Sequence, residues 1–225
     1  MKVYKRITVL FVMCISFCIV FSACSKVNPL YERVSELRSD LFLGEGENFT
    51  LSACYGFKET PYLNDANVND KIYCLNFKLK CQPTDNSTKK ISMEYDGKTY
   101  ESEFKLNPVT HTITALFEVD NFNLKEFNIN LSADSLTEKI TLHSILPQNT
   151  IDYKCALDYL YREQPSLIEK YTDTNGSFNA EIYARIIVKE NLPYWYVGIA
   201  SGNDNLKALL IDGFSGEILA IREVF

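Results

Sequence analysis

The chain has 225 residues, a net charge of −6 and an apolar content of 46%. This apolar content is enough for packed cores and excludes a chain that is disordered throughout. The acidic balance, without basic clusters, argues against nucleic acid as a partner, because contacts to phosphates need Lys and Arg.

The N-terminal segment has the pattern of an export signal. Lys2, Lys5 and Arg6 precede an apolar run over residues 7–21, which small residues then end. A membrane-spanning helix needs about 20 apolar residues, so this run is too short to serve as one. We therefore expect residues 1–23 to be a signal peptide, whose removal leaves a mature chain that is still more acidic.

The end of this segment is its most specific part. Phe21-Ser22-Ala23-Cys24 resembles the lipobox of bacterial lipoproteins, although phenylalanine replaces the usual leucine. The resemblance implies cleavage before Cys24 and attachment of diacylglycerol to its thiol, and two acyl chains are enough for stable anchoring. It also implies a location on the extracytoplasmic face of the cell membrane, with residues 24–29 as the lipidated tether. An ordinary signal peptide with an unrelated cysteine is the alternative.

Residues 30–148 are predicted to form an antiparallel β-sandwich. Residues 30–43 fit either a helix or a strand, and we favour the arm of a hairpin. Short segments of alternating apolar and polar residues follow, and Asp96-Gly97 is typical of a tight hairpin turn. The expected strands are 48–57, 71–80, 89–95, 100–106, 113–119, 127–131 and 140–145. The pattern resembles an immunoglobulin-like domain in architecture, without its Cys-Trp-Cys signature.

The chain changes character at Pro147. Residues 151–163 fit a helix, Pro165 suits the start of a second short helix, and the expected strands are 179–189, 193–201, 205–212 and 217–223. Helix followed by an antiparallel sheet predicts an α+β domain over residues 149–225.

This second domain resembles a PepSY-type domain. The resemblance rests on Tyr194-Trp195-Tyr196-Val197 and on the apolar strand that ends in Asp212-Gly213 and turns into the next strand. Members of that family occur in peptidase propeptides and in surface lipoproteins, which implies a modulator of a secreted peptidase. The whole layout is also similar to uncharacterised surface lipoproteins of Gram-positive bacteria.

The four cysteines outside residues 1–24 form no metal-binding pattern, because their spacing contains no C-x-x-C. If strands 48–57 and 71–80 pair with Phe57 opposite Lys71, Cys54 lies opposite Cys74, near disulfide distance. Reduced, buried thiols are the alternative.

No catalytic motif is found, so we expect no enzyme activity, cofactor or metal. The segment Gly213-Phe214-Ser215-Gly216 lacks the final glycine of a nucleophile elbow, and the oxygen-rich loop 64–70 lacks the pattern of a calcium-binding EF-hand. We expect a non-catalytic binding module for a protein or cell-wall partner. The alternatives are an inhibitor or chaperone-like modulator of a secreted peptidase, and an enzyme with an unrecognised site.

One sheet face of the second domain is a candidate binding surface. In strands 179–189 and 193–201, the residues of one parity are apolar and are expected to pack on the helix. The opposite face carries Tyr183, Arg185, Tyr194 and Tyr196 together with Ile187. Tyrosine and arginine are favoured at binding hot spots. This face either binds a partner or packs against the β-sandwich.

Overall fold

The computed structural model describes residues 27–61, 63, 65, 67–81, 88–108, 111–133, 136–201 and 206–224. The predicted signal peptide, residues 1–23, and the predicted lipidation site Cys24 lie outside these residues. The described elements are η1 (Pro29–Arg33), β1 (Val34–Glu45), β2 (Phe49–Glu59), β3 (Lys71–Cys81), β4 (Lys89–Tyr95), β5 (Lys98–Glu103), β6 (Lys105–Asn107), β7 (Thr112–Glu118), β8 (Glu126–Ala133), β9 (Leu136–Ser144), α2 (Tyr153–Glu163), α3 (Pro165–Lys170), β10 (Glu181–Lys189), β11 (Leu192–Ala200), β12 (Leu206–Asp212) and β13 (Ile218–Val224).

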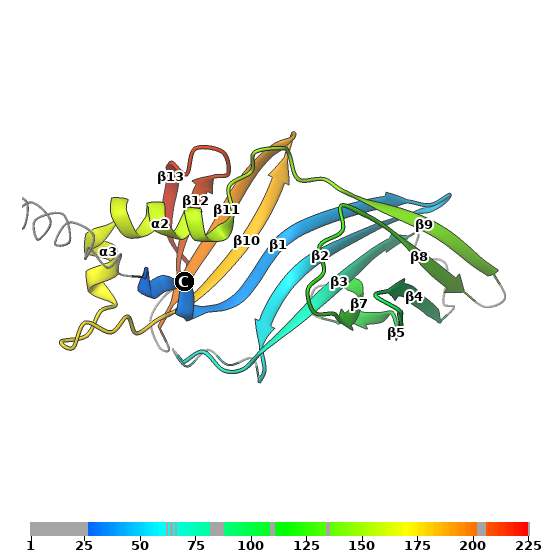
Figure 1. Cartoon of the computed structure of the whole chain (residues 1–225), viewed down its shortest axis with the longest axis horizontal. Helices are drawn as coiled ribbons and strands as arrows, with labels where there is room; N and C mark the ends of the chain where they lie inside the picture. Colours follow the sequence, from blue (N-terminus) through cyan, green and yellow to red (C-terminus); the bar gives the residue numbers. More distant parts are fainter. Residues whose placement is uncertain are drawn as a thin grey trace, which may run out of the picture.

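The strands belong to one mostly antiparallel, thirteen-stranded sheet (Figure 1). Its main path runs β13-β12-β11-β10-β1-β2-β3-β7-β6, and a branch of β9, β8, β4 and β5 leaves from β1. This confirms the β-rich class that was predicted. At Asp96 and Gly97, φ is 49° and 70°, so the predicted turn between β4 and β5 has the left-handed backbone of a type I′ hairpin.

Strand β1 joins the two halves of the molecule, which are a helix-covered half around β10–β13 and a curled half around β2–β9. Its first part, Val34 to Arg38, pairs in parallel with β10, and its later part pairs with β9 at Phe42 and Leu43. Strand β2 runs antiparallel along both parts, so the hairpin arm predicted for residues 30–43 is confirmed from Val34 onward, whereas residues 30–33 belong to η1. The sheet therefore continues across residue 148, where the predicted domain boundary lies.

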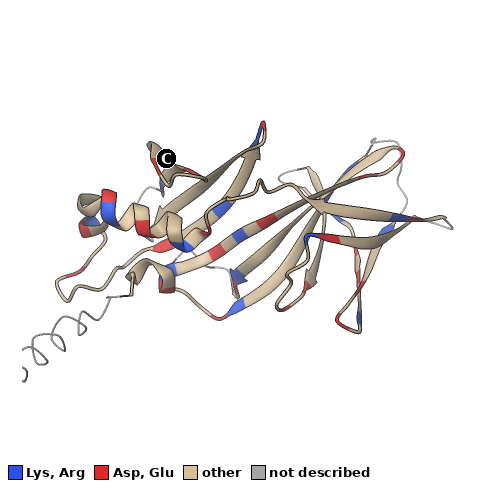
Figure 2. Cartoon of the chain, turned by 45° about the horizontal axis from the view of Figure 1, so that its top comes forward, with Lys and Arg blue, Asp and Glu red and all other residues tan. Residues whose placement is uncertain are grey.

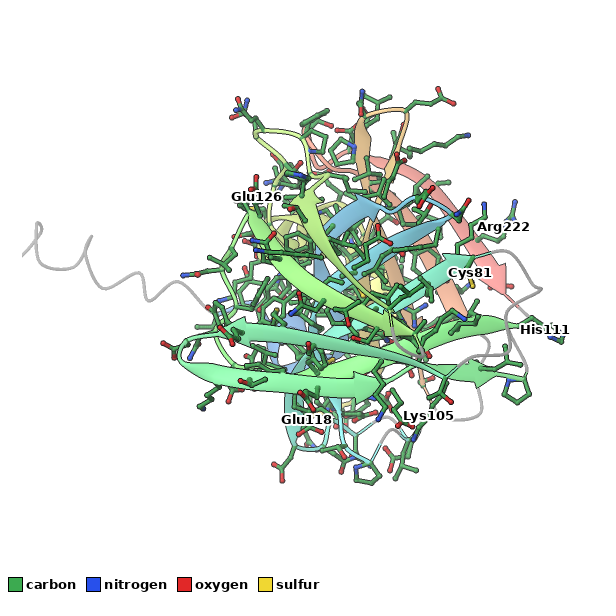
Figure 3. All side chains as sticks on the ribbon, turned by 90° about the vertical axis from the view of Figure 1, so that its right-hand side faces the viewer. Cys81, Lys105, His111, Glu118, Glu126 and Arg222 are labelled. Carbon is green, nitrogen blue, oxygen red and sulfur yellow. The ribbon has the colours of Figure 1, made fainter. Side chains whose placement is uncertain are left out.

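Both hydrophobic cores lie on the same face of the shared strands. In the helix-covered half, α2 and α3 cover β10–β12, as predicted for the helices. In the curled half, β8, β9 and β4 fold over β1–β3 and β7 (Figures 1 and 3). The most deeply buried side chains of the helix-covered core are Leu30, Val34, Leu157, Leu160, Ile182, Trp195 and Val197, and those of the curled core are Phe42, Leu51, Leu75, Phe77, Ile129 and Leu142.

A β-bulge brings Leu37 and Phe42 to this common face. An odd number of positions separates them, so a regular strand would direct them to opposite faces. The pairing of β1 with β2 skips Ser39, which restores the alignment. Gly56 lies opposite the bulge, where an added Cβ would be 1.9 Å from the carbonyl oxygen of Leu37. Only glycine fits there without displacing the backbone.

Candidate functional site

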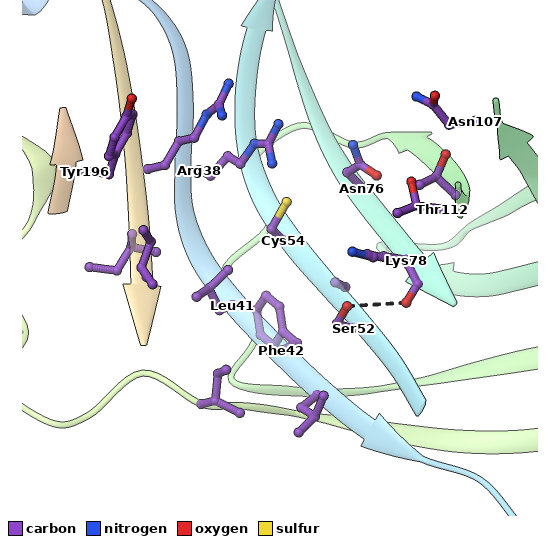
Figure 4. Close-up of a pocket in the computed structure, with 17 residues that line it drawn as sticks. Arg38, Leu41, Phe42, Ser52, Cys54, Asn76, Lys78, Asn107, Thr112 and Tyr196 are labelled. Carbon is purple, nitrogen blue, oxygen red and sulfur yellow. Dashed lines mark hydrogen bonds between the residues drawn. The ribbon is translucent and has the colours of Figure 1, made fainter. Parts of the chain in front are cut away.

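The face opposite the two cores contains a hollow of about 820 Å³. Residues from strands β11, β10, β1, β2, β3 and β7 contribute to its lining, so both halves of the molecule build it. Figure 4 shows Arg38, Cys54, Asn76, Lys78 and Tyr196 around this space. No second layer formed by the described residues covers this face, so polar side chains of β1, β2 and β3 are at least partly exposed to solvent here.

A buried carboxylate, Glu36, holds two arginines that line the hollow. Glu36 accepts a hydrogen bond from Nε of Arg38 at 2.5 Å and from Nη2 of Arg185 at 2.6 Å. Its side chain is 8% exposed, whereas Arg38 and Arg185 are 43% and 36% exposed. The two guanidinium groups therefore reach the solvent from a fixed buried anchor. The alternation of acidic and basic residues along β1 is visible in Figure 2.

The parallel pairing of β1 and β10 creates this arrangement, because it places Arg38 directly beside Arg185. Burial by itself would raise the pKa of Glu36. The hydrogen bonds and positive charges of Arg185 and Arg38 outweigh that effect and hold the pKa below its ordinary value of 4.5. Glu36 is thus an anion at neutral pH and can orient both arginines.

The predicted pairing of the two cysteines is wrong by two residues. Cys54 lies opposite Asn76, and Cys74 lies opposite Gly56, so the cysteines are diagonal neighbours on the hollow side of the sheet. The shift arises because β2 extends to Glu59, which pairs with Lys71. The buried Glu59 carboxylate accepts the backbone N–H groups of Leu63 and Asn69 and so fixes the loop beyond that point.

Both cysteines are free thiols in this structure. Burial raises the pKa of Cys54, and it raises the pKa of Cys74 to about 11. These thiols are neutral at pH 7, and the neutral thiol is a poor nucleophile. Cys54 therefore adds no negative charge to the hollow.

The predicted binding face is divided by the structure. Tyr183 is buried, and its hydroxyl donates to the buried carboxylate of Glu181, so Tyr183 offers no contact surface. Tyr194 and Tyr196 are half-buried, and Arg185 and Tyr196 line the hollow. The strands of residues 30–148 extend the same sheet sideways, because β1 pairs with the edge of β10, and no described part of them packs on this face.

The sequence analysis missed Glu36, Arg38, Asn76 and Lys78 as site residues. Glu36 and Arg38 alternate with the core residue Leu37, and Asn76 and Lys78 flank the core residue Phe77. This alternation marks a solvent-facing side, which was the available signal. The pairing of β1 with β10 places Arg38 beside Arg185, and no pattern of neighbouring residues in the sequence indicates that pairing.

The chain matches no protein-family model, no curated protein and no solved structure. Among the described residues, no helix is long and apolar enough to cross a membrane. The same part of the chain contains no group of three or more His, Cys, Asp or Glu side chains suited to a metal ion, and this includes the described positions of loop 64–70.

Proposed function

We propose that the protein is a lipid-anchored, extracytoplasmic lipoprotein that acts as a non-catalytic binding module, and that the hollow is its binding surface. The observation that carries this proposal is a sheet face that no described helix or strand covers. Arg38 and Arg185 are held there by a buried anion, beside the half-buried Tyr196. Arginine and tyrosine in a concave setting are typical of binding hot spots.

The chemistry of the hollow favours binding over catalysis. Its described lining residues include no histidine and no acid that could act as a general base. The hydroxyls of Ser52, Thr112 and Thr114 therefore have no base in the lining to activate them, and burial raises the pKa of Cys54 and keeps it protonated.

A lipid on Cys24 would hold the helix-covered half near the membrane. Asn28 donates from its side chain to the carbonyl of Leu157 at 3.1 Å and to the carboxylate of Asp158 at 3.0 Å, which ties the start of the described chain to α2. The four steps from residue 24 to residue 28 span at most about 14 Å, at about 3.5 Å per residue. The curled half would then lie farther from the membrane.

The finer fold interpretations belong to this proposal. A PepSY-like domain over residues 149–225 is supported by α2 against the antiparallel strands β10–β13 and by the turn at Asp212, whose carboxylate accepts the backbone N–H groups of Phe214 and Ser215. That likeness favours the second candidate function, a modulator of a secreted peptidase. An immunoglobulin-like layout of residues 30–148 is supported by the antiparallel strands around one core.

Site-specific crosslinking tests the binding proposal. A photo-reactive amino acid replaces Tyr196 in the full chain, expressed in bacteria that process lipoproteins. We expect discrete crosslinked products that disappear when Arg38 and Arg185 are both changed to Gln. The control position is Tyr161, which is 43% exposed on α2, away from the hollow. The same products from both positions, or none from position 196, would refute the hollow as the binding surface.

The anchor is tested separately with Cys24→Ala. The variant should lose incorporation of labelled fatty acid and should no longer be cleaved before residue 24. Ser22→Ala is a control that keeps the small-residue pattern and should be labelled normally. Unchanged labelling and membrane retention of the Cys24→Ala protein would contradict the lipoprotein assignment.

A further inference from the structure

We propose that the hollow is an oxyanion site for a phosphate ester, with Arg38, Arg185 and Lys78 as its positively charged contacts. This inference rests on the proposed binding function and names its ligand class. Lys78 belongs to β3, and strands β1 and β2 lie between β3 and the strand of Arg185, β10. Arg38 is level with Cys74 of β3 through Gly56, and Lys78 is four residues farther along β3, so the cations are spread both across and along the hollow.

The charged side chains that line the hollow favour a negative ligand. Its charged lining residues are Arg38, Lys78 and Arg185, and among the described lining residues none is acidic. The buried Glu36 below them compensates one of these three charges, which leaves two positive charges in a chain whose net charge is −6. Lys58 lies opposite Glu36 on β2 and Glu118 lies opposite Cys74 on β7, and neither residue lines the hollow.

A phosphate ester matches this surplus better than a single carboxylate. A phosphate monoester carries about 1.5 to 2 negative charges at neutral pH. A carboxylate carries one and would leave a cation unbalanced. The planar guanidinium groups bind tetrahedral oxyanions through paired N–H donors, and the lysine adds a mobile point charge.

The arginine pair is fixed before any ligand arrives. Two guanidinium groups side by side repel each other, and the carboxylate of Glu36 beneath both removes that penalty. Long side chains that are already held in place lose less conformational entropy when they bind. Tyr196 lies opposite Arg185 on the neighbouring strand β11 and supplies an apolar surface for the organic part of the ester.

Calorimetric titration of the full-length chain in detergent, with glycerol 3-phosphate as the probe, tests this site. We expect saturable binding, and no binding of glycerol. Lys78→Ala should weaken binding about threefold, as expected for an exposed charge. Arg38→Gln should weaken it about tenfold or more, since charge-assisted hydrogen bonds are stronger. Lys98→Ala, which removes an exposed lysine from β5, is the charge-matched control and should bind like the wild type.

Three results would overturn the proposal: no binding by the wild type, an equal loss for Lys98→Ala and Lys78→Ala, or tighter binding of succinate than of glycerol phosphate. The last result would assign the site to carboxylates. Thermal melting of each variant separates loss of the site from loss of the fold. If glycerol phosphate fails to bind while crosslinking at position 196 still depends on the arginines, the phosphate assignment fails and the binding function stands.

Discussion

The helix-covered half and the curled half use different means to cover the same face of β1 and β2. In one half, α2 and α3 pack on the sheet, and in the other the sheet folds back over itself through β9, β8 and β4. Each half thus builds its own core from one side of the shared strands. In the part of the chain that the structure describes, no layer covers the other side, so charged residues such as Arg38 and Lys78 lie there.

The largest expected effects come from the two core residues that flank the bulge. Leu37→Ala, in the helix-covered core, should cost about 2–5 kcal/mol of unfolding free energy, and Phe42→Ala, in the curled core, about 3–5 kcal/mol. Because both residues belong to β1, each variant should unfold in a single transition by calorimetry and by circular dichroism. Two separated transitions in either variant would show that the halves are independent.

Gly56→Ala should disrupt the β-bulge that places the two cores on one face of the sheet. The new Cβ meets the backbone of Leu37, which cannot rotate away as a side chain could. We expect a loss of about 2–3 kcal/mol in denaturant unfolding, as for an overpacked core. Ser52→Ala, on the same strand, is the control and should stay within about 0.5 kcal/mol of the wild type. A Gly56→Ala protein as stable as that control would argue against the bulge geometry.

Glu36→Gln tests the sheet face that contains the hollow, and it should lower the free energy of unfolding by less than the core variants do. Charge-assisted hydrogen bonds to two partly exposed arginines are worth about 1–2 kcal/mol here after allowance for solvent screening. The pKa of Glu36 is lowered in the folded state, so its contribution is present above pH 4.5 and is lost as the pH falls through the folded pKa.

The stability difference between the wild type and Glu36→Gln should therefore shrink on acidification below pH 4.5. Chemical denaturation over a series of pH values measures it. Glu103→Gln, which removes an exposed ion pair with Lys90, is the control and should show almost no difference at any pH. A difference between wild type and Glu36→Gln that grows toward low pH would contradict the assigned ionisation.

Local patterns were enough to predict most elements and little of their assembly. The alternation in β2 and β3, the turn at Asp96-Gly97 and the helix that became α2 are encoded by neighbouring residues, and each was predicted near its observed position. The register of β2 and β3 was predicted wrongly because β2 continues to Glu59. A charged residue at this position suggests an exposed loop, and its burial is evident only in the folded chain.

The candidate site was predicted only in part for a related reason. Arg185 and Tyr196 were identified from the parity of their own strands, and both line the hollow. Tyr183 shares that parity but is buried, because the neighbouring strand β1 and the Glu181 carboxylate enclose it. Arg38 and Lys78 join the site through pairings between strands that are distant in the sequence, and periodicity does not report such pairings.

Hydroxyl-radical footprinting of the native full-length protein, read by mass spectrometry at single residues, tests the central claim most directly. Trp195 and Tyr196 are adjacent in the chain but lie on opposite faces of β11, with Trp195 only 2% exposed. We predict strong labelling of Tyr196 and weak labelling of Trp195, although indole is the more reactive ring. Strong labelling of Trp195 with protection of Tyr196 would contradict a sheet that is covered on its core side and open at the hollow.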